Sequence, residues 1–157
     1  FTFLPLFILI IFFLFKKNGT KGLLVILLFI SVLILFTDQF TNVVKDFTQR
    51  LRPCRLDELQ GLLRDIDIRC GKYGFFSAHA ANSISVTIFI INCVDESVKK
   101  FLKPVLILWV MIFSYSRIYL GVHYPLDTIF GLSFGIFSGF LFKYIYNYFI
   151  SVKVFSD

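Results

Sequence analysis

The chain has 157 residues, of which 57% are hydrophobic and 22 are Phe, and it carries a formal charge of +6. Its mean hydropathy of +0.81 excludes a soluble enzyme, a disordered chain and a small disulfide scaffold, because a water-exposed domain of this size needs a large polar surface. The positive charge does not indicate a nucleic-acid partner, which would require a water-exposed basic domain, and we attribute it to membrane topology and an anion site.

Five charge-free stretches follow one another along the chain: residues 1–15, 22–37, 73–94, 104–116 and 128–142. Apolar or aromatic residues extend each stretch past its charged borders, and about 20 helical residues cross the ~30 Å hydrocarbon layer. The stretches are apolar on all sides, without the alternation of a barrel wall. We therefore predict an all-α, polytopic transmembrane helical bundle with five spanning helices.

The chain is expected to form one membrane-embedded domain, residues 1–157, that is incomplete at its N-terminus. It opens with Phe1, already inside an apolar stretch, without a basic region before it or a cleavage site after it. We expect a further segment upstream that carries a sixth spanning helix in the full protein.

Residues 53–76 form a long loop between the second and third predicted spans. Within it, Leu56, Leu59, Leu63 and Ile66 repeat at intervals of three and four, which is typical of a helix lying along the membrane interface. Two interpretations remain open, a lid or headgroup-recognition element beside the site and a plain surface helix covering the bundle.

Lys and Arg residues divide evenly between the two sides of the predicted membrane. The first side carries Lys16, Lys17, Lys21, Lys99, Lys100, Lys103, Lys143 and Lys153. The second side carries Lys45, Arg50, Arg52, Arg55, Arg64, Arg69, Lys72 and Arg117. If several cations of the second side serve an anion site or are offset by neighbouring acids, the positive-inside rule makes the first side cytoplasmic.

Cys54 and Cys70 bracket the long loop, sixteen residues apart. A disulfide here would stabilise the fold by about 3 kcal/mol in the chain-entropy model and would form only in an oxidising compartment. The alternative is two reduced thiols near a membrane surface. Zinc ligation is not expected, because neither His lies at zinc-ligand spacing from these cysteines.

Three polar blocks fall on the second side. In the first, Lys45 and Arg52 lie seven residues apart with Pro53 directly after, so a helix ending at Pro53 would place both cations on one face. Taken alone, such cations are more often interfacial anchors than an anion site.

The second block runs from Tyr73 to Ser83 and leads into an apolar stretch. Ser77 is a natural helix N-cap, and the free amides behind it, including that of Ala78, would form an anion cradle. His79 in the first turn is either part of that site or an exposed interfacial residue.

In the third block, Arg117 ends one span and Pro125 begins the next, with Asp127 four residues after His123. A carboxylate at that position can accept from one imidazole nitrogen, which fixes the tautomer and leaves the other nitrogen free to attack. The alternative role for Asp127 is a helix-dipole cap.

The three blocks together supply cations, a hydroxyl, free helix amides and two imidazoles. These are the groups that bind a phosphate oxyanion. The three blocks resemble the type 2 phosphatidic acid phosphatases, which share their site with the vanadium haloperoxidases. The family pattern Lys-x6-Arg-Pro is matched from Lys45 to Pro53, and Ser-Arg-x5-His-x3-Asp is matched in full from Ser116 to Asp127. Pro-Ser-Gly-His is matched in part, with Phe76 for Pro and Ala78 for Gly.

The resemblance implies roles for these residues and a six-helix membrane core, of which the five predicted spans would be the second to sixth. His123 is implied as the nucleophile that forms a phosphohistidine, Asp127 as its orienting group and His79 as the general acid. The implied phosphate-binding groups are Lys45, Arg52, Ser77, Arg117 and the backbone amide of Ala78. The resemblance implies neither a metal nor a cofactor.

The expected substrate is a membrane lipid phosphate monoester or diphosphate, because a site level with the headgroups reaches lipids more easily than soluble phosphates. Phosphatidic acid, phosphatidylglycerol phosphate, undecaprenyl diphosphate and lipid A phosphate all remain open. Two alternatives to hydrolysis are a phosphotransferase using the same site and a non-catalytic anion-binding membrane protein. We expect a bacterial inner-membrane location with the site facing the periplasm or cell exterior.

Gly131, Gly135 and Gly139 repeat every four residues in the last predicted span. They form a smooth helix face for close packing, against either a helix of the same bundle or a second protomer. The sequence leaves the oligomeric state open.

Overall fold

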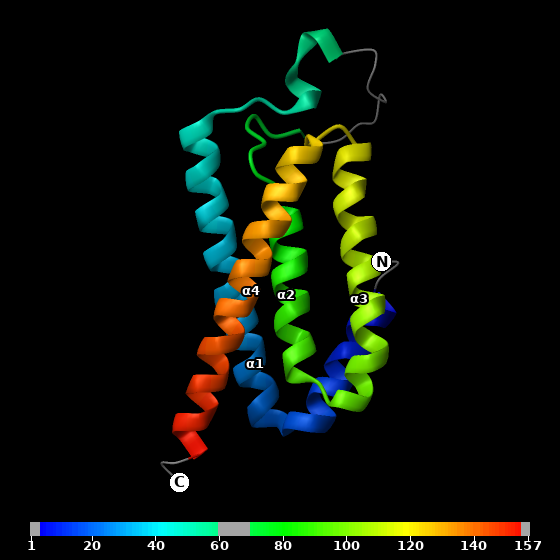
Figure 1. The fold of residues 1–157 in the computed structure, drawn as a ribbon, viewed down its shortest axis with the longest axis vertical. Coiled ribbons are helices and arrows are strands. Elements are labelled where there is room, and N and C mark those ends of the chain that lie inside the picture. The colour runs from blue at the N-terminus through cyan, green and yellow to red at the C-terminus, as the bar shows by residue number, and fades with distance from the viewer. Residues whose placement is uncertain (1–3, 60–69, 155–157) are drawn as a thin grey trace.

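The computed structural model describes residues 4–59 and 70–154, and within them it is a bundle of helices (Figure 1). In chain order the elements are α1 (Leu4–Thr48), the 3-10 turns η1 (Pro53–Arg55) and η2 (Asp57–Leu59), α2 (Ala78–Cys93), α3 (Glu96–Tyr119) and α4 (Pro125–Val154). The described residues contain no strand beyond a single antiparallel bridge between Leu51 and Tyr73. The prediction of an all-α fold is confirmed.

Helix α1 combines the first two predicted spans. Its 45 residues form two helical segments joined at a kink, where Gly19 has a non-helical backbone with φ 64° and ψ −175°. Figure 1 shows the chain reversing direction at this bend, near the lower end of the bundle. A positive φ of this kind suits Gly, because a Cβ would crowd the adjacent backbone.

Three helices of the described residues are long and apolar enough to cross a membrane: Leu4–Thr48, Glu96–Tyr119 and Pro125–Ser151. Helix α2 is apolar but has only 16 residues. The expected number of five spans, or six in a longer chain, is therefore not established by the structure. Helix α2 is shorter than its apolar run because residues 73–77 form a loop before it.

Helix α4 packs closely on α2 along its three glycines. A Cβ placed at Gly139 would lie 2.9 Å from the carbonyl oxygen of Ser85, and one at Gly135 would overlap the carbonyl oxygen of Ala81. Only glycine lets the two backbones approach this closely. Of the two partners left open by the sequence, the structure shows the helix within the bundle.

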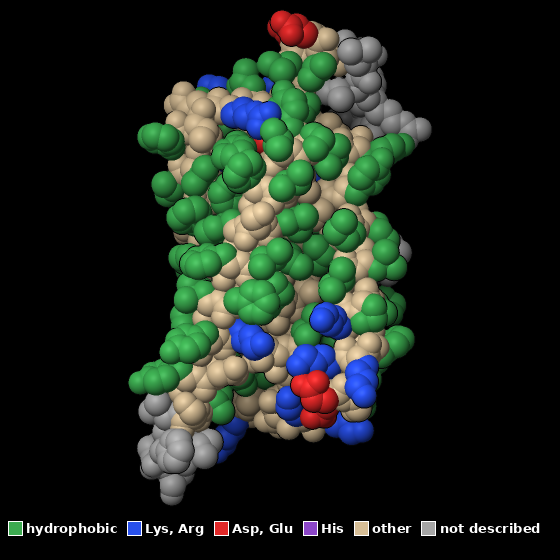
Figure 2. All heavy atoms as spheres, viewed as in Figure 1, with side chains coloured by type: hydrophobic (Ala, Val, Ile, Leu, Met, Phe, Trp, Pro, Cys, Tyr) green, Lys and Arg blue, Asp and Glu red, His purple; other side chains and the backbone are tan. Residues whose placement is uncertain are grey.

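The two ends of the bundle are polar and its middle is apolar. Figure 2 shows a broad belt of hydrophobic side chains, with Lys and Arg side chains gathered at its lower end and others above it. Lys17 and Asn18 donate hydrogen bonds to the carbonyl oxygens of Val94 and Cys93, which ties the α1 bend to the α2–α3 connection. Such a belt is the surface expected of an integral membrane protein.

The described part of the predicted loop, residues 53–59 and 70–76, lies at the opposite end from the α1 bend. Its described part contains η1 and η2, and Cys54 is joined to Cys70 by a disulfide with a Cα–Cα distance of 6.6 Å. The predicted amphipathic helix falls mainly on residues 60–69, which lie outside the described residues.

Candidate active site

Arg52 does not share a helix with Lys45, contrary to the sequence-based expectation. Helix α1 ends at Thr48, and Gln49 follows with a φ of 47°. Arg52 itself is extended, with φ −73° and ψ 155°. The helix ends early because residues 50–52 pair with residues 72–74 instead of continuing the helical hydrogen bonds.

This pairing positions the Arg52 side chain. Around the bridge between Leu51 and Tyr73, the Gly74 amide donates to the Arg50 carbonyl oxygen at 2.9 Å. The Nε atom of Arg52 donates to the Tyr73 carbonyl oxygen, also at 2.9 Å. A Cβ on Gly74 would lie 2.9 Å from Cγ of Arg52, so a side chain there would displace the guanidinium.

Ser77 caps the N-terminus of α2, as predicted. Its side chain accepts from the Ala80 amide at 3.4 Å, and its own amide donates to the Asp127 carbonyl oxygen at 2.9 Å. The amides of Ala78 and His79 have no intrahelical acceptor, as expected for the first turn, and no hydrogen bond among the described residues uses them. This helix end is therefore able to accept an anion.

His123 and Asp127 are both buried, with 2% and 0% of their surfaces exposed. The Nδ1 atom of His123 is 3.5 Å from Oδ2 of Asp127, and the same oxygen accepts from the Tyr124 amide at 3.0 Å. Asp127 lies in the first turn of α4, two residues after Pro125. With Nδ1 turned toward the carboxylate, Nε2 is the imidazole nitrogen left for chemistry.

Arg50 is a site residue that the sequence analysis did not identify. Its Nη1 atom donates to Oδ1 of Asp127 at 2.9 Å, and its guanidinium carbon lies 4.2 Å from the centroid of the Tyr124 ring. The buried carboxylate thus has one oxygen toward Arg50 and the other toward His123. The sequence did contain a signal for this partner, because a buried acid beside a histidine needs a cation. Three arginines lie between residues 50 and 55, however, and the signal does not distinguish among them.

The remaining predicted residues converge around His79. Its imidazole lies within electrostatic range of four site side chains: Arg117, His123, Lys45 and Arg52. The Arg117 guanidinium lies over the Phe113 ring at 4.7 Å, and its buried Nε has no partner among the described residues. The structure therefore brings all the predicted cations and both imidazoles to one end of the bundle.

The pKa of His123 lies below its ordinary value. Its burial disfavours the charged imidazolium, and this effect exceeds the opposing influence of the Asp127 carboxylate, while the charges of Arg52 and Lys45 lower the pKa further. This shift favours the neutral imidazole, the form that has a free lone pair on one nitrogen. Among the described residues, no group of three or more His, Cys, Asp or Glu could hold a metal ion.

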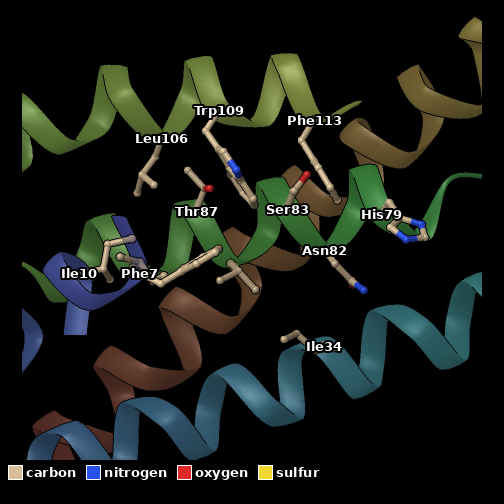
Figure 3. Close-up of a pocket in the computed structure, with 12 residues that line it drawn as sticks. Phe7, Ile10, Ile34, His79, Asn82, Ser83, Thr87, Leu106, Trp109 and Phe113 are labelled. Atoms are coloured by element: carbon tan, nitrogen blue, oxygen red, sulfur yellow. The ribbon is translucent and has the colours of Figure 1, made fainter. Parts of the chain in front are cut away.

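An apolar cavity of about 270 Å³ extends from His79 into the bundle. In Figure 3, His79, Asn82 and Thr87 follow one another along α2, and His79 and the Phe7–Ile10 pair stand at opposite ends of the view. Trp109 and the other aromatic and aliphatic side chains close the remaining walls. The cavity thus joins the polar end of the bundle to its apolar middle.

These features define the class of protein: an integral membrane helical bundle with a buried histidine–aspartate pair and several cations at one end. The PAP2 superfamily model matches residues 23–151. The chain belongs to the PAP2 superfamily. The resemblance found in the sequence is confirmed at the level of the family.

Two relatives are lipid A 4'-phosphatases. The protein from Bacteroides thetaiotaomicron is 36% identical over 144 residues, covering 90% of this chain and 63% of the relative. The protein from Porphyromonas gingivalis is 34% identical over 140 residues, covering 88% of this chain and 58% of the relative. The chain therefore spans about three fifths of the length of these curated relatives.

The fold is also similar to a solved structure. The PAP2 type phosphatidylglycerolphosphate phosphatase from Bacillus subtilis aligns with a TM-score of 0.68 at 24% identity, covering 93% of this chain and 69% of that one. At this identity the similarity supports the shared helical architecture alone.

Proposed function

We propose that this chain is the catalytic part of a membrane lipid phosphatase that acts through a phosphohistidine. The observation that carries the proposal is the buried His123–Asp127 pair, 3.5 Å apart, within electrostatic range of Lys45 and Arg52. An anion-binding protein needs the cations but has no use for an oriented, neutral imidazole.

In the first step, Nε2 of His123 attacks the phosphorus atom and the ester P–O bond breaks. The leaving alkoxide takes a proton from His79, and Asp127 stabilises the charge that develops on the His123 ring. In the second step, water attacks phosphorus, the P–N bond breaks and His79 accepts the proton from water. Inorganic phosphate and neutral His123 are then restored, and these steps require neither a metal nor another cofactor.

The phosphoryl oxygens are held by Lys45, Arg52 and Arg117, together with Ser77 and the free amide of Ala78 at the start of α2. Charge on these oxygens grows as the transition state forms, so fixed cations and amide dipoles stabilise it more than the ground state. The Ala78 amide is available without a positive φ, because Ala78 is the first residue of α2. Alanine in place of the family's glycine therefore keeps this donor.

The substrate class is a lipid carrying a phosphate monoester or diphosphate. The apolar cavity beside His79 offers space of about 270 Å³ for part of an acyl chain while the phosphate occupies the polar end. The two lipid A 4'-phosphatase relatives favour a lipid A phosphate among the candidates. A phosphotransferase would use the same first step, with an alcohol replacing water in the second.

We also propose that this end of the bundle faces the periplasm or cell exterior. The Cys54–Cys70 disulfide supports this orientation, because such a bond persists in an oxidising compartment. The lysines at the other end fit a cytoplasmic surface under the positive-inside rule.

The test is phosphate release by the purified protein in detergent with EDTA, using lipid A, phosphatidylglycerol phosphate, phosphatidic acid and undecaprenyl diphosphate in parallel. His123→Ala should abolish release while largely keeping binding of the lipid substrate, and acid-labile phosphate should be trapped on wild type only. Retention of more than a few per cent of activity by His123→Ala would show that the nucleophile is another residue. Transfer to an added alcohol without release would favour the phosphotransferase.

A further inference from the structure

A second cavity lies between α2, α3 and α4, away from the candidate active site. Its volume is about 340 Å³. Much of its wall is apolar, formed by isoleucines from all three helices and by Phe140, and three lysines line it as well: Lys99, Lys103 and Lys143. No step of the proposed reaction uses this cavity.

The three lysines differ in their charge pairing. Lys99 donates to Glu96 on the same helix at 2.7 Å. Lys103 and Lys143 have no carboxylate partner among residues 4–59 and 70–154, and the Nζ atom of Lys143 lies 5.8 Å from the centroid of the Phe140 ring. Two unneutralised ammonium groups, one from α3 and one from α4, therefore line the same apolar cavity.

These lysines lie at the membrane surface opposite the active site. Along α3, Lys99 and Lys103 precede Arg117 by 18 and 14 residues, and along α4, Lys143 follows Pro125 by 18. At 1.5 Å per residue these separations are about 21 to 27 Å, close to the ~30 Å thickness of the hydrocarbon layer. Figure 2 shows Lys and Arg side chains gathered at this lower end of the α2–α3–α4 face.

We propose that this cavity binds one anionic phospholipid from the leaflet opposite the active site, with its phosphate between Lys103 and Lys143 and an acyl chain along the isoleucine-lined wall. Charge complementarity selects an anionic headgroup, because a phosphocholine group would bring a third ammonium to the lysines. The apolar wall selects a lipid over a soluble phosphate. The bound lipid bridges α3 and α4 and stabilises their packing.

The test measures thermal unfolding of the purified chain in dodecyl maltoside micelles that contain increasing amounts of phosphatidylglycerol or phosphatidylcholine. Saturating inorganic phosphate occupies the active site in every sample. Phosphatidylglycerol should raise Tm and phosphatidylcholine should not. For Lys103→Gln with Lys143→Gln, the phosphatidylglycerol concentration giving half of the Tm shift should rise by roughly 25-fold, since each lysine near a membrane surface contributes about 1 kcal/mol.

The matched control is Lys16→Gln with Lys21→Gln, which removes two positive charges at the same end of the bundle from side chains outside the cavity. This control should keep the wild-type Tm shift, as should the charge-preserving pair Lys103→Arg with Lys143→Arg. If the Gln variant of the cavity proves unstable, loss of the shift in the Arg pair overturns the proposal.

Three other outcomes also contradict the proposed lipid site. Equal Tm shifts with phosphatidylglycerol and phosphatidylcholine would indicate unselective apolar binding. An equal loss of the Tm shift in the Lys16/Lys21 and Lys103/Lys143 variants would indicate that the lipid responds to positive surface charge in general and not to the cavity. With inorganic phosphate omitted, a shift that is reproduced by glycerol 3-phosphate, which has no acyl chain, and is lost in the Lys103/Lys143 variant would indicate a site for a free anion.

Discussion

Replacing Arg50 by Gln removes the only side-chain donor that the described residues provide to Oδ1 of Asp127. A hydrogen bond to a charged group is worth about 1.5–3 kcal/mol, and breaking it leaves a buried carboxylate less well compensated. Because the Arg50 side chain is 38% exposed, water replaces part of this stabilisation, so the lower value applies. A loss of about 1.5 kcal/mol at the transition state lowers kcat by roughly tenfold.

The same substitution should also change the pH profile. Without the Arg50 charge, the Asp127 carboxylate stabilises the His123 imidazolium more strongly, so the acidic limb of the kcat profile should move to higher pH. Arg50→Lys keeps the charge and the position over Tyr124 but loses the planar guanidinium with its several N–H donors. Its kcat should therefore fall between those of wild type and Arg50→Gln. The assay is phosphate release from the best lipid of the panel over a range of pH.

Arg55→Gln is the matched control, because Arg55 lies in the same loop but is exposed and donates to the Cys70 carbonyl oxygen. Its kcat and pH profile should equal those of wild type. If Arg50→Gln keeps more than half of the wild-type kcat, the pairing with Asp127 has no catalytic consequence. A rise in KM with kcat unchanged would instead place Arg50 in contact with the substrate.

Three further predictions concern other parts of the molecule. Because burial lowers the pKa of His123, the wild-type acidic limb should lie below the ordinary histidine value of about 6.5, and an acidic limb above 6.5 would contradict this assignment. Gly135→Ala should lower Tm by several degrees, because overpacking against α2 costs about 1–3 kcal/mol of folding free energy. The control Ser133→Ala, on the exposed side of α4, should leave Tm unchanged. In the absence of reductant, the double variant Cys54→Ser with Cys70→Ser should have a lower Tm than wild type, and with reductant the two Tm values should be equal. A wild-type Tm that is the same with and without reductant would exclude the disulfide.

The sequence predicted the membrane class, the helical fold and the residues that converge on the site. These features depend on composition and on spacing that local physics preserves, such as the Ser77 cap and the turn from Arg117 to Pro125. The spacing of His123 and Asp127 also placed the two side chains correctly, because the loop and first turn between them are short.

The sequence failed where long-range pairing decided the local structure. The end of α1 at Thr48 depends on residues 72–74, which lie more than twenty positions away, so a helical extrapolation from Lys45 to Arg52 could not detect it. The same pairing presents Arg50 to Asp127. The charge-free runs did place a break between residues 15 and 22, where Gly19 bends α1, but the bend itself depends on the backbone conformation of that glycine.

The backbone pairing of residues 50–52 with residues 72–74 also separates the candidate active site from changes farther along the loop. It closes the long loop at its base, and the Cys54–Cys70 bond holds the two ends together directly beyond. An insertion or deletion between the two cysteines should therefore leave Arg52 and the start of α2 in register.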